Sequence, residues 1–286
     1  MDAHAGGGQP GSLSPLDLLA AHPQLEVALD RQSRSKGDLM GSFHWEVDLQ
    51  GPANALQALA RDFTAGKVRV SADATQSKHI LQMDSFERCS TDREVTVQTR
   101  EFLPTLSGAL ALTLGTAPDL RMGAICRKHD DGRTDYFLEA ETGALHAECG
   151  VVAAVATVTG PDGKPVVRLQ PPSPAVKMVD LALTSPMVAK ALRLWWADSA
   201  DWDGLYRIWE VIENAAGGGG STVAAGWTSN NGRTRFKRTA CSVGAAGDKA
   251  RHGVESEAPP PNPMKLEEGR AYVEDLLRRL LSSLGA

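Results

Sequence analysis

Apolar and polar residues alternate in short runs through the first 170 residues. Such runs, rich in β-branched and aromatic side chains, predict strands at 43–49, 67–71, 79–83, 120–127, 135–141, 147–159 and 165–169. Asp131-Gly132 is the dipeptide that a two-residue type I′ hairpin favours. Pro52 is suited to the first position of a helix over 52–63, and 13–30 predicts two short helical turns. We therefore expect an α+β lobe with a mostly antiparallel sheet and covering helices.

Residues 92–114 carry two conflicting patterns. The β-branched residues of 94–99 favour a strand, whereas 106–114 favours a helix. Pro104 lies between the two stretches and is expected to separate them.

The pattern changes after three prolines at 171, 172 and 174, where the spacing of apolar residues becomes helical. Ser185-Pro186 predicts a helix start, and apolar positions at three- and four-residue spacing continue to the glycines 217–220. A final helix is predicted with Asn262 as its cap, Pro263 as its first residue and a leucine-rich stripe. The expected organisation is a disordered tail (1–12), an α+β domain (13–170) and an all-helical domain (173–286).

Composition and charge exclude several classes of protein. No apolar run approaches the length of a membrane helix, and the first dozen residues lack a basic start and an apolar core, so we expect a cytoplasmic protein. The formal net charge of -5 provides no strong overall field for nucleic acid or membranes. The four cysteines form no CxxC pair and are interpreted as free buried thiols.

Two pairs of residues have the side chains that bind zinc. They are Cys126-x-x-His129 and His146-x-x-Cys149. The predicted hairpins place Cys126 opposite Phe137, and Phe137 opposite Cys149. The two sulfur atoms would then lie about 9 to 10 Å apart, too far for one zinc ion. The tip of the first predicted hairpin, 129–131, carries one histidine and two aspartates, but it lacks the spaced oxygen ligands of a calcium-binding loop. The sequence predicts no metal and no cofactor.

Aromatic residues are concentrated in the helical part. Trp202, Tyr206 and Trp209 recur at helical spacing, and three further tryptophans in this part are Trp195, Trp196 and Trp227. Such a stripe more often fills a core, although a stacking platform for a ligand is the alternative.

The segment 233–253 carries six cations against one carboxylate, a local charge of about +5 in an acidic chain. The cations are Arg233, Arg235, Lys237, Arg238, Lys249 and Arg251. They could bind an external anion such as a phosphate or an acidic peptide. They could instead pair with nearby glutamates, of which the candidates are Glu210, Glu213, Glu255, Glu257, Glu267 and Glu268. Asn231-Gly232, just before the segment, predicts a helix end.

A catalytic arrangement is the competing interpretation of the same segment. If 248–252 were helical, Asp248 could orient His252 as an acid/base pair, with Cys241 or Ser242 as the nucleophile. Helical Asp and His pairs are common without catalysis, and no nucleophile elbow or phosphate loop accompanies this one.

One part of the chain shows a resemblance. Three stretches and the last helix resemble the C-terminal end of a group of uncharacterised bacterial proteins. The stretches are Phe236-Lys-Arg-Thr-Ala-Cys-Ser, Ala250-Arg-His-Gly and Pro260-Pro-Asn-Pro-Met-Lys-Leu-Glu-Glu. The resemblance covers about a sixth of the chain. It implies a bacterial, cytoplasmic protein and carries over no catalytic residue.

These observations predict a non-catalytic binding or regulatory protein whose helical lobe recognises an anionic ligand or protein partner. The residues predicted to make this contact are Arg235, Lys237, Arg238, Arg251 and His252. Nucleic acid is a less favoured partner, and no membrane partner is expected. The alternatives are a small hydrolase or phosphodiesterase that uses Asp248 and His252, and a scaffold or assembly subunit.

Overall fold

The computed structural model describes residues 43–73, 77–137, 173–255 and 258–286. Within these, 44–128 and 134–286 form one compact unit, and Phe43 with 129–133 falls in a second. The predictions for the tail, for 13–30 and for the strands at 147–159 and 165–169 lie outside the described residues. The domain boundary predicted at 170–172 lies outside them as well.

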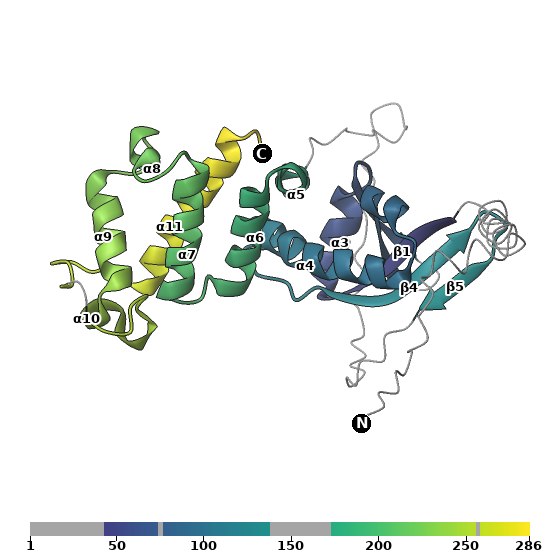
Figure 1. Cartoon of the computed structure of the whole chain (residues 1–286), viewed down its shortest axis with the longest axis horizontal. Helices are drawn as coiled ribbons and strands as arrows, with labels where there is room; N and C mark the ends of the chain where they lie inside the picture. The colour runs from purple at the N-terminus through teal and green to yellow at the C-terminus, as the bar shows by residue number, and fades with distance from the viewer. Residues whose placement is uncertain (1–42, 74–76, 138–172, 256–257) are drawn as a thin grey trace, which may run out of the picture. The chain divides into compact units, whose positions relative to one another are not determined.

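The N-terminal part contains a five-stranded sheet, which confirms the α+β prediction (Figure 1). Its elements are β1 (Phe43–Gln50), α3 (Ala53–Asp62), β2 (Val68–Asp73), β3 (Lys78–Met83), the 3-10 turn η1 (Asp84–Arg88), α4 (Asp92–Leu114), β4 (Arg121–His129) and β5 (Thr134–Phe137). The strand order is β2-β3-β1-β4-β5, and the β1–β3, β2–β3 and β4–β5 pairs are antiparallel. The first four strands and two helices thus have the order of a split βαβ motif.

Strand β1 shows why one face of the sheet is buried. Trp45, Val47 and Leu49 alternate along it and are all buried, as the two-residue period predicts. Glu46 lies on the opposite face and is also buried, but its carboxylate accepts a hydrogen bond from Gln82 and pairs with Lys128 at 2.8 Å. Its charge is therefore compensated inside the sheet.

Helix α4 is continuous, so the predicted break at Pro104 is wrong. Thr91 and Glu94 form a capping box that fixes the start of the helix. The buried positions Val95 and Thr99 follow the helical period, and Pro104 lies inside the helix at a half-buried position. Tertiary burial along the whole helix thus outweighs the local strand preference and the hydrogen bond that a proline cannot make.

The β4–β5 hairpin differs from the prediction by one residue. His129 and Arg133 close a three-residue loop in which Gly132 has a φ of +86°, instead of a two-residue type I′ turn. Cys126 consequently lies opposite Tyr136, and the predicted partner Phe137 lies opposite Ile125. The longer loop moves every pair in the hairpin by one position.

The C-terminal part is helical, as predicted. It contains α5 (Pro174–Thr184), α6 (Pro186–Asp198), α7 (Trp202–Ala215), α8 (Ser221–Ala224), α9 (Asn230–Cys241), α10 (Val243–Ala246), the 3-10 turn η2 (Gly247–Lys249) and α11 (Leu266–Ser283). Ser185 caps α6 with Pro186 at its first position, as predicted. Helix α11 begins at Leu266, so Asn262 and Pro263 precede it and do not start it.

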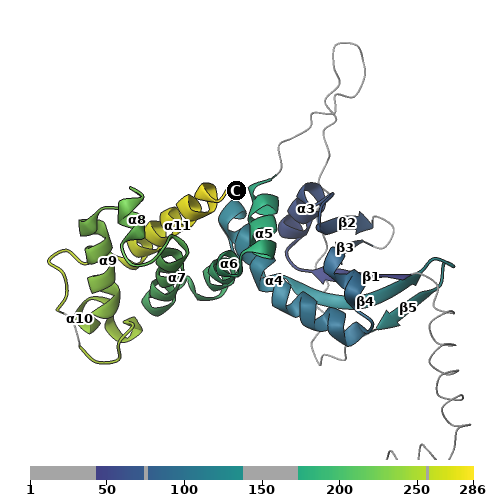
Figure 2. The same ribbon diagram turned by 45° about the horizontal axis from the view of Figure 1, so that its top comes forward.

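Helices from both sides of the predicted boundary pack together. Helix α6 lies between α4 and α7, and α4 also contacts α5 (Figure 1). Helix α7 in turn lies beside α9 and α11 (Figure 2). At Gly108, α4 approaches α6 so closely that a Cβ atom would lie 2.1 Å from the carbonyl oxygen of Leu192.

The aromatic stripe belongs to the core. Trp195, Trp202, Tyr206 and Trp209 are buried, which confirms the packing interpretation, while Trp196 and Trp227 are half-buried. The described cysteines at 89, 126 and 241 are free and buried, as expected, and Cys149 lies outside the described residues. None of the described helices is both long and apolar enough to cross a membrane.

Candidate functional site

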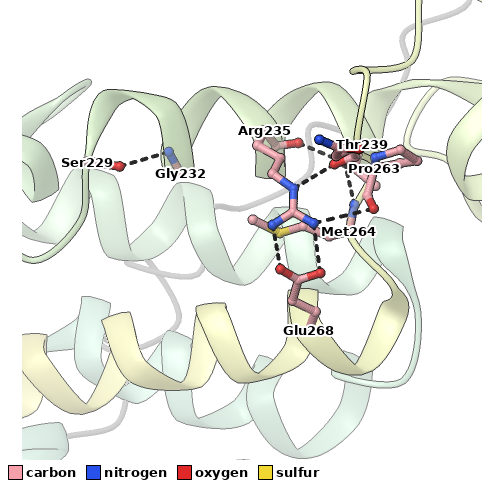
Figure 3. A network of polar contacts seen from close by, with 8 residues as sticks. Ser229, Gly232, Arg235, Thr239, Pro263, Met264 and Glu268 are labelled. Atoms are coloured by element: carbon pink, nitrogen blue, oxygen red, sulfur yellow. Dashed lines mark hydrogen bonds and ion pairs between the residues drawn. The ribbon is translucent and has the colours of Figure 1, made fainter.

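Helix α9 carries four of the six cations of the basic segment. The Ser229 side chain accepts a hydrogen bond from the backbone amide of Gly232 at 3.0 Å and caps the helix (Figure 3). Asn231-Gly232 therefore lies in the first turn of a helix, and the predicted helix end is wrong. The serine cap supplies the partner that the first amides need, and this outweighs the low helix propensity of asparagine and glycine.

The buried face of α9 fixes the direction of its cations. Phe236 is fully buried, and its ring contacts those of Trp202, Trp209 and Tyr272 at centroid distances of 6.1, 5.9 and 5.1 Å. Because Phe236 points to the core, its neighbours Arg235 and Lys237 lie toward the two edges of this buried face.

Arg235 is already paired within the chain. Its guanidinium donates two hydrogen bonds to the Glu268 carboxylate of α11, at 2.5 and 2.9 Å, and a third to the carbonyl of Asn262 at 2.6 Å (Figure 3). Forked pairs of this kind hold both partners in a defined geometry. For Arg235, the structure therefore shows the internal pairing that was one of the two interpretations of the basic segment.

The proline segment, residues 258–264, is tied to α9 by the next residues of the helix. Arg238 donates to the carbonyl of Ala258 at 2.9 Å, and the Thr239 hydroxyl accepts from the amide of Met264 at 3.2 Å. These bonds, with those of Arg235, attach both ends of the proline segment to α9. The basic residues thus have a structural role that their charge alone did not reveal.

Arg251 also has an internal partner. It pairs with Glu210 of α7 at 3.0 Å, and its guanidinium lies 4.1 Å from the centroid of the Tyr206 ring. Burial, with Cys241 nearby, raises the pKa of Tyr206 to about 12. Arg251 therefore also follows the internal-pairing interpretation of the basic segment.

Two more cations of the basic segment are also paired within the chain. Arg233 pairs with the buried Glu213 at 2.9 Å, and Lys249 lies 3.6 Å from a carboxylate oxygen of Asp201. Three of the glutamates that the sequence offered as internal partners, at 210, 213 and 268, are therefore used. The local sequence did not predict the ion pair of Lys249 with Asp201. It also did not predict the hydrogen bonds from α9 to the proline segment.

Lys237, Arg238 and His252 differ from these paired residues. Lys237 is half-buried and makes no hydrogen bond or ion pair with any described residue. Arg238 bonds only to neutral carbonyl oxygens, and no described carboxylate lies within 4.0 Å of it. His252 is exposed, without a described partner. Two consecutive positive charges of α9 thus have no described counter-charge.

The residues of the catalytic alternative are not brought together. Asp248 lies in η2, which ends at Lys249, so the helical spacing assumed for Asp248 and His252 is absent. Both are exposed, and no hydrogen bond joins them in the described part of the chain. The Cys241 and Ser242 side chains are buried at 1% and 0% exposure. A nucleophile at either position would have no access to a substrate at His252.

The second half of the zinc motif, His146 and Cys149, lies outside the described residues. Among the described residues, no three His, Cys, Asp or Glu side chains are grouped as metal ligands. Burial raises the pKa of Cys126, which disfavours the thiolate form that binds metals.

The pairing of Arg235 and Glu268 has a measurable effect on ionisation. The Arg235 hydrogen bonds lower the pKa of the Glu268 carboxyl below its ordinary value of 4.5. A lowered pKa means that the pair stabilises the fold above pH 4.5 and loses this contribution as the pH falls through the lowered value. In Arg235→Gln we expect the pKa of Glu268 to rise toward 4.5, measured by NMR titration of the carboxyl carbon. An unchanged pKa in the variant would show that Arg235 and Glu268 are not paired in solution.

No family model, curated protein or solved structure matches the chain. The contacts and charges of the described residues therefore carry the functional proposal.

Proposed function

We propose that this is a non-catalytic binding or regulatory protein of the bacterial cytoplasm, and that it recognises an acidic segment of a partner protein through α9. The proposed contact residues are Lys237 and Arg238 of α9, together with the exposed His252. The observation that carries the proposal is the pair of consecutive cations on α9 for which the described chain supplies no carboxylate.

Arg235 and Arg251, first expected to contact the partner, have a different role in this proposal. Each is held by a carboxylate, Arg235 by Glu268 and Arg251 by Glu210. The first pair joins α9 to α11, and the second holds the segment between these helices against α7. A surface that is already ordered loses less conformational entropy on binding, which favours affinity.

Charge favours an acidic partner over a nucleic acid. The chain is acidic overall, with a formal net charge of -5, so it provides no overall attraction for a nucleic acid. A short acidic segment needs only a local site. Exposed charges are screened by salt beyond about 10 Å at 0.1 M, so the interaction is expected to weaken with ionic strength.

The test uses a fluorescein-labelled hexaglutamate peptide and fluorescence anisotropy at low and high salt. We expect wild type to bind with salt-sensitive affinity, and Lys237→Ala to bind about three- to fivefold more weakly. Lys237→Glu should weaken binding further because it repels the peptide. Lys190→Ala, which removes an exposed lysine of α6, is the matched control and should bind like wild type.

Lys237 makes no described bond, so its removal should leave thermal unfolding unchanged and separate binding from stability. If wild type does not bind the peptide, or if Lys237→Ala binds as wild type does, the proposal is wrong. If the protein binds a single-stranded oligonucleotide more tightly than the peptide, the partner is a nucleic acid and not an acidic protein segment.

A further inference from the structure

A pocket of about 380 Å³ lies where the end of α6 meets the first turns of α11 and the connection from α4 to β4. Its lining includes Trp196, Ala200, Leu266, Glu267 and Arg270. The volume is within the range of small-molecule sites. None of these residues belongs to the basic segment, so the pocket is independent of the function proposed above.

Arg270 supplies a positive charge to this pocket. Its guanidinium lies 5.1 Å from the centroid of the buried Trp195 ring, and no described carboxylate lies within 4.0 Å of it. The two other arginines of α11 differ, since Arg278 pairs with Glu274 and Arg279 with Asp275. Stacking on an indole orients a guanidinium while leaving its N–H groups able to bind an anion.

Trp196 supplies a flat apolar wall. Its indole N–H donates to the carbonyl of Pro118 at 3.1 Å, so its only donor is already satisfied and the ring is held in place. Leu266 lines the same pocket. A ring placed here would contact apolar surface and would not compete with a polar group for the indole N–H.

We propose that this pocket binds a small flat aromatic molecule that carries one carboxylate. The carboxylate accepts the forked hydrogen bonds of Arg270, and the ring packs against Trp196 and Leu266. Glu267 also lines the pocket, and its negative charge disfavours a second negative charge on the ligand. The pocket therefore selects a monoanionic carboxylate over a phosphate dianion.

The probe is 2-naphthoate, and binding is followed by titration calorimetry and by NMR of the Trp196 and Arg270 side-chain N–H signals. Wild type should bind 2-naphthoate about tenfold more tightly than neutral 2-naphthamide, and more tightly than 2-naphthyl phosphate. Arg270→Gln should lose this preference for the anion. Glu267→Gln should improve binding of the phosphate, because it removes the repulsion.

Two further variants separate the pocket from general effects. Arg279→Gln removes an α11 arginine that does not line the pocket, and it should bind 2-naphthoate like wild type. Ala200→Leu should fill the pocket and abolish binding without a change in charge. The proposal is overturned if wild type fails to bind 2-naphthoate at millimolar concentration, or if Arg270→Gln or Ala200→Leu binds it as wild type does.

Discussion

Gly108→Ala is expected to lower the free energy of unfolding by about 3 kcal/mol or more. Alanine normally stabilises a helix interior relative to glycine by about 1 kcal/mol, so the sign here is reversed by packing. The added Cβ atom would lie 2.1 Å from the carbonyl oxygen of Leu192, in the middle of α6. Both contact points lie inside long helices that also pack on other elements, so neither can move without cost. Urea unfolding followed by circular dichroism measures the change.

Ser107→Ala is the matched control, one residue earlier on the same helix. The Ser107 hydroxyl is buried and has no hydrogen-bond partner among the described residues, so its removal should leave stability unchanged or raise it slightly. A Gly108→Ala protein as stable as wild type would contradict the close approach of α4 and α6.

Glu213→Ala is expected to lower the free energy of unfolding by about 3 kcal/mol, because it leaves the half-buried Arg233 guanidinium and two further donors without their acceptor. The Glu213 carboxylate is 4% exposed and accepts hydrogen bonds from Arg233, from the Thr222 hydroxyl at 2.7 Å and from the Gly220 amide at 2.8 Å. All three donors would lose this acceptor together. Thermal unfolding should report the loss, and amide hydrogen exchange at Gly220 should accelerate.

Glu213→Gln separates charge from hydrogen bonding at this position. The amide keeps one acceptor oxygen and the size of the side chain, so we expect a smaller loss than in Glu213→Ala. Equal stability of Glu213→Ala and wild type would mean that the carboxylate does not hold the glycine-rich turn to α9.

The starts of helices and the positions of strands could be predicted from the sequence because their causes are local. Ser185-Pro186 marks the start of α6, since a serine side chain and a proline at the first position act within one turn. The aromatic and β-branched residues of 43–49 likewise predicted the strand β1, in which Trp45, Val47 and Leu49 are buried. Both signals depend on neighbours a few residues apart.

The continuity of α4 was not accessible from the same kind of pattern. The β-branched residues of 94–99 and Pro104 favoured a strand and a break, whereas the structure shows a capping box of Thr91 and Glu94 at the start of one helix. Only the burial of Val95 and Thr99 against other elements favours the helix through the proline. Propensity is a weak preference that tertiary packing overrides.

In the candidate site too, the sequence predicts the presence of the cations, whereas the fold decides their partners. Its excess of positive charge and the supply of nearby glutamates are properties of composition, so both interpretations were visible in the chain. Which cation meets which carboxylate depends on the packing of distant turns. Arg235 and Glu268 are 33 residues apart, and they meet because α9 and α11 pack beside each other, with the rings of Phe236 and Tyr272 in contact.

Local sequence thus specified the secondary structure of most described elements and the presence of an unusual group of cations. Three-dimensional packing decided that Arg235 and Arg251 are paired while Lys237 and Arg238 lack a described counter-charge. It also placed Trp196 beside Arg270 in one pocket. The physical reason is range: caps and periodicity act within a turn, whereas ion pairing and pocket formation need side chains that only the folded chain brings within a few ångströms.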